Sequence, residues 1–581
     1  MNFTGPVTEI AQHIHKEKYR GQFESWPEFT YRVANGLKDN DEHYKHLLDI
    51  IGNQKFLPAG RVQSAIGSPR QTTAFNCFVS MTIPDSMEGI MDALSEAAQT
   101  MRMGGGIGYD FSTLRPRGAK IKSLDSSSCG AVGFMDVYNA LCGTISSAGH
   151  RRGAQMGVLR VDHPDIEEFI DAKTNQTQLT NFNISVAVTD KFMEAVRNDE
   201  LFDLQFEGEV YNTVRATYLW DKIMRATWDY AEPGILFIDK INRKNNLHYC
   251  ETISATNPCG EQPLPPHGAC LLGSINLVKF LKPLPTGVYA FDYDSMVEAI
   301  PHIVRAQDNI IDRTIYPLEE QKLEAQNKRR MGIGVTGLAN AIEALGFPYG
   351  TSGFLEEAEL IFKTLRDEVY RASIELAKEK GAFPLFNAVE YLKSEFAQEL
   401  PEDIRDDIAK YGIHNSHLLS FAPTGTISLS SDNVSSGIEP VFMVEGTRRI
   451  REFDGEKIVD VIDYGYSNFG VTPVTADQLS VEAHVDMLCL ASRYSDSAVS
   501  KTCNVGDDVD WERFKNVYMR AYEGGASGCT TFRLAGKRFG IMEAKKPESN
   551  SSQLEGTKLE PALEGAACTF DPETGIRTCD E

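Results

Sequence analysis

The segment Asn257-Pro258-Cys259-Gly260-Glu261 places a cysteine between an amide and a carboxylate. Pro258 fixes one φ angle and Gly260 permits a sharp bend. This pairing excludes the middle of a helix and a central strand, so we predict a loop that carries the sulfur at its tip. An isolated segment of this kind is more often a surface turn with an incidental cysteine. The other cysteines of the chain favour a functional interpretation.

Size and charge narrow the classes of function. The 581-residue chain has 58 Lys and Arg against 82 Asp and Glu, a formal net charge of −24. Nucleic-acid affinity depends on Lys and Arg that neutralise phosphates, so we expect no direct nucleic-acid binding. No apolar run approaches the roughly 20 residues of a membrane span, and the start of the chain lacks the apolar region of a secretory signal. We therefore expect a cytoplasmic protein without a membrane interaction.

The cysteines are too few for a disulfide scaffold, since 11 are spread over 581 residues. No C-x2-C motif or His/Cys cluster has the spacing of zinc ligands, so no metal site is predicted. Cys568 and Cys579 lie on a disordered end, beyond a polar Pro-, Glu- and Ser-rich linker. A linker of about 25 residues spans roughly 25 to 30 Å as a coil, which lets this dithiol reach a buried site for thiol–disulfide exchange. The alternative is an accidental pair of exposed thiols.

Strand and helix signals alternate as far as about residue 540, which is typical of a parallel α/β sheet or barrel. We predict an N-terminal helical segment at 1–55, a catalytic domain at 56–541, and a flexible linker with a cysteine tail at 542–581.

Asp85, with Glu88 three residues later, predicts a capping box at the start of a helix. The segment Pro423-Thr424-Gly425-Thr426-Ile427-Ser428 offers hydroxyl and backbone N–H donors for phosphates, or else forms an ordinary turn.

Several of these elements, in the same order along the chain, resemble the catalytic subunit of ribonucleotide reductases. They are Cys77 in FNCFVS, the segment 257–261, Cys270 in ACLLGSINL, RRMGIGV at 329–335, APTGTIS at 422–428 and the Cys568/Cys579 tail. The resemblance covers nearly the whole chain from about residue 56. It implies a ten-stranded α/β barrel of two five-stranded halves, in which a central finger loop carries the radical cysteine, Cys259. It also implies that Cys77 and Cys270 lie on neighbouring strands.

The class within this family decides the source of the radical. The late strand Gly528-Cys529-Thr530-Thr531-Phe532-Arg533 has no tandem tyrosine, and the chain leaves too little room for an N-terminal regulatory cone. No glycyl-radical segment is present near its end. Resemblance and exclusion thus imply a class II enzyme with adenosylcobalamin as cofactor. The alternatives are a class I catalytic subunit that needs a separate radical-generating subunit, and a non-radical thiol-redox or nucleotide-binding protein.

The resemblance implies a role for each site residue. Cys259 forms a thiyl radical that takes the ribose 3′-hydrogen, Glu261 is the base at the 3′-hydroxyl, and Asn257 holds the sugar. Cys77 protonates the departing water, and Cys77 with Cys270 supplies two electrons and becomes a disulfide. The tail dithiol reduces that disulfide and is restored by a thioredoxin- or glutaredoxin-like partner. Positions implied to bind the substrate, a ribonucleoside di- or triphosphate, are Arg61, Asn76, Gly106, Pro423, Thr424, Gly425, Thr426 and Ile427.

An allosteric specificity site for a deoxynucleotide or ATP effector is a further implication of the resemblance. Asp85 matches an effector-contacting acid and Arg115 a phosphate-contacting arginine. Lys173 opens the loop, up to Asn181, that relays the identity of the effector base. A helix cap for Asp85 and a solvated charge for Arg115 are the structural alternatives. Because the family forms this site across a dimer interface, we expect a homodimer.

Overall fold

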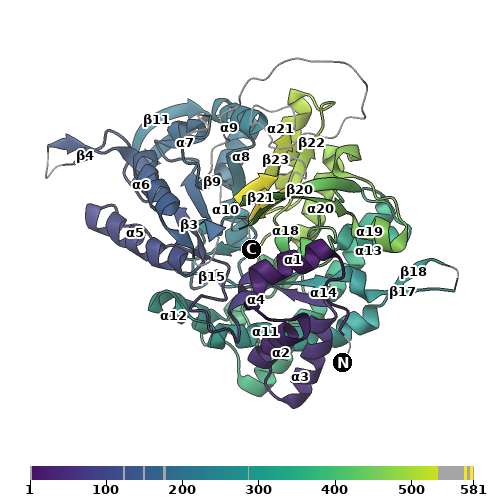
Figure 1. Cartoon of the computed structure of the whole chain (residues 1–581). Coiled ribbons are helices and arrows are strands. Elements are labelled where there is room, and N and C mark those ends of the chain that lie inside the picture. The colour runs from purple at the N-terminus through teal and green to yellow at the C-terminus, as the bar shows by residue number, and fades with distance from the viewer. Residues whose placement is uncertain are drawn as a thin grey trace.

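The computed structural model describes residues 3–121, 125–147, 151–152, 154–174, 178–285, 287–452, 455–533, 568–571 and 576–579. Figure 1 shows the blue elements of the first part of the chain on the left and the green elements of the last part on the right. The purple helices α2 and α3 lie below them. Parallel strands that alternate with helices give the chain the α/β fold that its sequence predicts.

Three short helices precede the strands: α1 (Glu9–Tyr19), α2 (Trp26–Leu37) and α3 (Asp41–Gly52). Each begins after a polar N-cap whose side chain accepts a backbone N–H, namely Thr8, Ser25 and Asn40. Their buried faces contact α4 (Gly60–Ala65) and α11 (Tyr293–Arg313). The three helices therefore pack into the main hydrophobic core.

The first part of the chain forms parallel strands that are hydrogen-bonded in chain order: β2 (Cys77–Val79), β3 (Gly106–Asp110), β8 (Gln155–Arg160), β9 (Phe182–Val188) and β12 (Gly234–Phe237). The helices between them are α5 (Met87–Arg102), α6 (Gly130–Thr144), α7 (Ile166–Asp171), α8 (Asp190–Asn198) and α9 (Ala216–Tyr230). β9 is buried along its whole length. Burial on both faces explains why its sequence, FNISVAV, is mostly apolar rather than strictly alternating.

The second part adds β15 (Ala269–Cys270), β16 (Leu272–Asn276), β19 (Gly332–Thr336), β22 (Thr502–Val505) and β23 (Gly528–Arg533). β15 runs antiparallel to β2, and β23 runs antiparallel to β12. These pairings give an eight-stranded sheet in the order β15-β2-β3-β8-β9-β12-β23-β22. β16 pairs with β19 and with β1 (Phe56–Pro58) in a second sheet. Single parallel bridges join Ile333 to Leu419 and Phe421 to Val499.

The helices of this part include α10 (Ile238–Lys244), α12 (Glu319–Lys328), α13 (Leu338–Ala344), α14 (Ser352–Lys380), α17 (Glu402–Tyr411), α18 (Gly425–Leu429), α20 (Val481–Arg493) and α21 (Trp511–Glu523). β10 (Leu201–Phe206) pairs with β11 (Glu209–Arg215), and β20 (Glu445–Glu452) pairs with β21 (Gly455–Ile462), in two separate two-stranded sheets. The arginines of RRMGIGV are structural: Arg329 pairs with Asp308, and Arg330 with Glu251. These buried pairs fix the approach to β19.

One local prediction is wrong. The N-cap of α5 is Ser86, whose hydroxyl accepts the Gly89 N–H, because the Asp85 carboxylate is turned toward Arg115 instead.

The tail, for which we predicted disorder, contains the antiparallel strands β24 (Cys568–Asp571) and β25 (Ile576–Cys579). The linker predicted between residue 542 and the tail cysteines lies outside the described residues. In the part of the chain that the structure describes, no helix has the length and apolar composition needed to cross a bilayer.

Candidate active site

The segment 257–261 forms the tip of a hairpin. β13 (Ala255–Thr256) and β14 (Pro263–Leu264) pair antiparallel at its base. The Asn257 N–H donates to the Gln262 carbonyl over 3.1 Å, and the Gly260 N–H donates to the Asn257 carbonyl over 3.1 Å. Gly260 has φ +84°, a conformation that favours glycine. The proline and glycine thus shape a loop tip, as the sequence predicts.

The side chains of Asn257 and Glu261 meet within this loop. Asn257 Nδ2 donates to Glu261 Oε1 over 2.8 Å, and Asn257 Oδ1 accepts the Gln262 N–H over 2.9 Å. Glu261 is 1% exposed, and its second oxygen, Oε2, has no hydrogen-bond partner among the described residues. Burial raises the pKa of the Glu261 carboxyl to about 7, against the smaller opposing effects of the Glu261 backbone N–H and of the bond from Asn257. One carboxylate oxygen is therefore poised to exchange a proton near neutral pH.

Two further thiols lie beside the loop. Cys77 in β2 and Cys270 in β15 are register partners on adjacent antiparallel strands. A Cβ placed on Gly106 would lie 3.0 Å from Cys77 Sγ and 3.1 Å from Pro258 Cγ, so this glycine separates the Cys77 sulfur from the loop. Cys77, Cys259 and Cys270 are all buried. The structure thus brings the paired cysteines and the loop tip to one place.

The polar residues predicted around this place converge on the same strands. The Asn76 N–H donates to the Cys270 carbonyl, and the Asn76 carbonyl accepts the Gly106 N–H. The Asn76 carboxamide is buried, and both its oxygen and its nitrogen lack a partner in the described part of the chain. Arg61 lies close by, because a Cβ on Gly104 would sit 3.0 Å from its Cζ. A buried amide without partners indicates a ligand or water that satisfies it.

The segment Pro423–Ile427 leads into helix α18. Thr424 has φ +56°, and its hydroxyl accepts the Gly437 N–H over 2.6 Å and bonds to Ser428 Oγ over 3.0 Å. The first backbone hydrogen bond of the turn is donated by Ser428 to the Thr424 carbonyl. The Thr424 hydroxyl is thus engaged with the protein, and the backbone N–H groups of residues 425–427 are the donors at this end of the helix.

Two of the predicted effector residues meet each other. Arg115 Nε donates to Asp85 Oδ2 over 2.7 Å, and the Arg115 N–H donates to Asp85 Oδ1 over 3.1 Å. Lys173 has other partners, since its Nζ donates to the backbone carbonyls of Leu179 and Phe182. Asp85 and Arg115 therefore form one acid–base pair at the start of α5, whereas Lys173 anchors the loop that follows α7.

The tail brings its two cysteines together along the backbone. Cys568 and Cys579 are register partners in the β24–β25 hairpin. β25 contacts α18, and Figure 1 draws this hairpin in yellow near the centre of the molecule. The tail thus lies against the helix at which Pro423–Ile427 ends.

Other contacts hold the loop, and the sequence reasoning missed them. Ser420 Oγ donates to the Glu261 carbonyl over 2.9 Å, and the Ala498 N–H donates to the same carbonyl over 3.0 Å. Asn183 Nδ2 donates to the Pro258 carbonyl over 3.1 Å. No motif marks these residues. Within the described residues, no group of three or more His, Cys, Asp or Glu side chains is arranged to hold a metal ion.

Comparisons with known proteins agree with this geometry. A model of the ribonucleotide reductase barrel domain matches residues 75–464, about two thirds of the chain. The chain is 34% identical to a vitamin B12-dependent ribonucleoside-diphosphate reductase of Thermoplasma acidophilum, over 100% of this chain and 79% of that protein. It is 33% identical to the protein of the same name from Mycobacterium tuberculosis, over 96% of this chain and 82% of the relative. The chain therefore belongs to the ribonucleotide reductase family.

Proposed function

We propose that this chain reduces ribonucleotides to 2′-deoxyribonucleotides by thiyl-radical chemistry and depends on adenosylcobalamin. Family membership supports the reaction, and the names of the relatives support the cofactor and a ribonucleoside diphosphate substrate. The observation that carries the proposal is the convergence of the Cys259 loop, the paired cysteines Cys77 and Cys270, and the unpartnered oxygen of Glu261.

The loop tip has open space on one side, on which we place the cofactor. A Cβ placed on Gly260 would meet no atom within 4 Å, so the space next to Cys259 is open on this side. Cys259 and Gly260 would form the protein face that such a group meets. When bound, adenosylcobalamin supplies the organic radical chemistry that an unactivated ribose carbon requires.

Each of the three residues of the loop has its own role at the sugar. Cys259, as a thiyl radical, removes the 3′-hydrogen and later returns it. Glu261 takes the proton of the 3′-hydroxyl and returns it when the 3′-hydroxyl is restored, for which its free oxygen and its pKa of about 7 are suited. The amide of Asn257 orients Glu261 through Oε1 and also hydrogen-bonds the sugar.

The paired cysteines supply the reducing equivalents. Cys77 gives its proton to the departing 2′-hydroxyl, which leaves as water. Cys77 and Cys270 together lose two electrons and the second proton, and a disulfide forms as the 2′-carbon gains hydrogen. Their register pairing on β2 and β15 supports this step. The tail dithiol, Cys568 and Cys579, then reduces this disulfide by exchange, and a thioredoxin- or glutaredoxin-like partner reduces the tail.

The phosphates of the substrate would bind at α18. The backbone N–H groups of Gly425, Thr426 and Ile427 form the positive end of this short helix. Arg61, Asn76 and Gly106 would contact the sugar side of the substrate. Pro423 and Thr424 form the turn into α18, at which Thr424 has a left-handed backbone conformation.

We place the effector site at the start of α5 and the homodimer interface on α5 and α6. Asp85 and Arg115 would open their ion pair to receive a deoxynucleotide or ATP, and the loop held by Lys173 would relay the base. Met87 and Met91 on α5 and Val137 on α6 are 62%, 40% and 39% exposed. These two helices contact each other. Such apolar exposure on neighbouring helices supports a homodimer interface there.

The strand pairings support a closed ten-stranded barrel. The eight-stranded sheet ends at β15 and β22. β16 follows β15 after one residue and pairs with β19. The bridges from Ile333 to Leu419 and from Phe421 to Val499 then continue from β19 toward β22.

We further propose the division of the chain into an N-terminal helical segment at 1–55, a catalytic domain at 56–541 and a linker with the cysteine tail at 542–581. We also propose a cytoplasmic location.

The experiment is a reduction assay with the purified chain, CDP and dithiothreitol, without any other protein. The proposal predicts dCDP formation that depends strictly on added adenosylcobalamin. Activity that appears only with a second radical-generating protein would assign the chain to class I instead. Absence of dCDP under both conditions, with thiol exchange intact, would favour the non-radical interpretation.

A further inference from the structure

The loop after α18 carries an unusual pair of residues. Asp432 and Asn433 have φ +62° and φ +58°, in the left-handed region where residues other than glycine are uncommon. Asp432 is nevertheless 6% exposed, so its conformation is held by surrounding contacts.

The contacts come from the other end of the chain. Asp432 Oδ1 accepts the Val7 N–H over 2.8 Å, the Thr8 N–H over 2.7 Å and the Thr8 hydroxyl over 2.9 Å. Thr8 is the N-cap of α1. The Asp432 carboxylate thus sits at the positive end of an 11-residue helix, where a negative charge is stabilised.

A second, apolar contact joins the same elements. Leu429, the last residue of α18, packs in one small cluster with Ile14 of α1 and Val461 of β21, and Ile10 and Val459 border it. Because this cluster contains no part of the Asp432 contact, α1 meets the α18 region in two independent ways.

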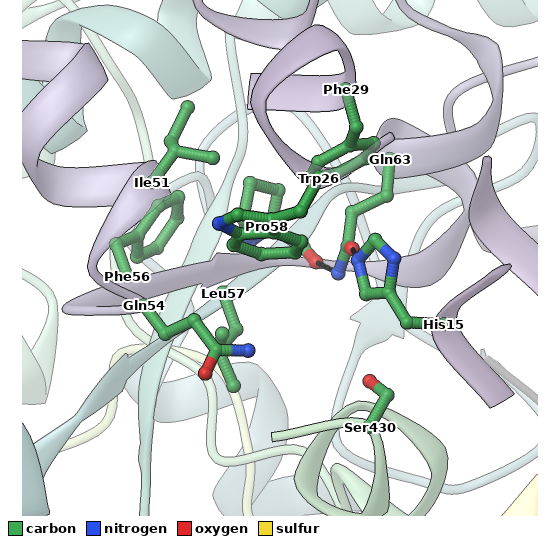
Figure 2. A pocket seen from close by; sticks show the side chains of 10 residues that line it. All are labelled: His15, Trp26, Phe29, Ile51, Gln54, Phe56, Leu57, Pro58, Gln63 and Ser430. Carbon is green, nitrogen blue, oxygen red and sulfur yellow. Dashed lines mark hydrogen bonds between the residues drawn. The ribbon is translucent and has the colours of Figure 1, made fainter. Parts of the chain in front are cut away.

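The second half of α1 is fixed to the core. His15 is bonded to Gln63 over 3.0 Å and lies edge-on to the rings of Trp26 and Phe29, with centroids 4.9 and 4.5 Å away. Figure 2 shows His15 and Gln63 together, with Ser430 facing them across a small cavity. Burial lowers the pKa of His15 to about 3, so this anchor is uncharged at neutral pH. Helix α1 is thus held at its N-terminal end by Asp432 and in its second half by the core.

We infer that Asp432 is a positioning residue for the substrate phosphates: it ties the loop after α18 to α1 and thereby fixes the N–H groups of residues 425–427. This inference rests on the proposed phosphate site at α18. It assigns to the N-terminal helix a part in substrate affinity, although no residue of that helix is proposed to touch the substrate.

The test compares three variants in the full-length chain. Asp432→Gly removes the carboxylate while glycine accepts the left-handed backbone. Asp432→Asn keeps an acceptor at the same position and serves as the conservative rescue. Asn433→Gly is the matched control, since its left-handed backbone is next in the chain but its side chain bonds to the Ile462 carbonyl and not to α1.

We expect Asp432→Gly to raise the KM for CDP and the Kd for CDP without cofactor about ten-fold, with kcat changed less than about two-fold. Asp432→Asn should restore most of the affinity, and Asn433→Gly should leave it unchanged. Effector binding, which uses Asp85 and Arg115, should not move in any of them. A role in stability alone would instead lower the melting temperature without changing the CDP affinity of the folded protein.

Thr8→Val gives a second route that leaves the loop itself intact. It should weaken CDP binding less than Asp432→Gly, and the double variant should be less than additive, because both changes break the same contact. Full additivity, or unchanged CDP affinity in Asp432→Gly, would overturn the inference while the wild type still binds and reduces CDP. If the wild type itself binds no CDP, the proposed function fails, and the inference fails with it.

Discussion

Replacing Glu261 by Gln should change both the free energy of unfolding and the rate of CDP reduction. Burial raises the pKa of this carboxyl from 4.5 to about 7. Each pKa unit corresponds to about 1.4 kcal/mol, so the ionised carboxylate costs the folded state about 3 kcal/mol. Below pH 4.5 the group is protonated in both states and costs nothing. The cost grows between pH 4.5 and 7 and stays constant above pH 7.

The assay is urea unfolding of wild type and Glu261→Gln from pH 4 to 9, with reduction rates measured in parallel. The difference in the free energy of unfolding should shift in favour of the variant by about 3 kcal/mol as the pH rises through this window. The wild-type rate should rise with pH to a plateau above about 7, because the base must be ionised. The variant should be slower by about 10²- to 10⁴-fold, with no such rise.

Glu343→Gln is the matched control, because burial also raises the pKa of Glu343 to about 7. Its Oε1 accepts the N–H groups of Tyr349 and Val474, and it takes no part in the proposed chemistry. This variant should show a similar pH-dependent gain in stability with an unchanged rate. A stability difference for Glu261→Gln that is flat in pH, or a rate close to that of the wild type, would refute the reasoning.

Three further outcomes are expected. Gly108→Ala should destabilise the protein by more than about 3 kcal/mol in thermal unfolding, because its Cβ would lie 1.8 Å from the Thr256 carbonyl oxygen. Gly21→Ala, whose Cβ would meet its nearest atom at 3.6 Å, should be tolerated. Arg115→Met should weaken effector binding while the basal CDP reduction rate persists; an unchanged effector affinity would argue against that site. Deletion of residues 560–581 should spare turnover with dithiothreitol and impair it with thioredoxin, and equal rates with both reductants would exclude the tail from the electron path.

The sequence predicts those parts of the site that lie close together in the chain. A proline and a glycine around Cys259 predict a loop tip, and the structure has one. The pairing of Cys77 with Cys270 followed from the family resemblance, since the spacing of two cysteines does not specify strand neighbours. Asp85 was assigned a helix cap from its spacing to Glu88, but Ser86 is the cap and Asp85 pairs with Arg115, because a local pattern does not reveal a competing charge 30 residues away.

The remaining contacts depend on topology. Ser420 lies 159 residues from the Glu261 carbonyl that it binds, and Thr8 lies 424 residues from Asp432. Neither serine nor threonine carries a signal that distinguishes such a role from a solvated hydroxyl. These contacts form only once the strands have brought distant segments together, so they could be found in the structure alone.

The central claim is that the sulfur of Cys259 carries the hydrogen atom in the reaction. The most direct measurement is dCDP formation by Cys259→Ser with adenosylcobalamin and dithiothreitol, together with CDP binding by the same variant. We predict no detectable dCDP and a CDP affinity equal to that of the wild type. A Cys259→Ser variant that still converts CDP to dCDP would contradict it.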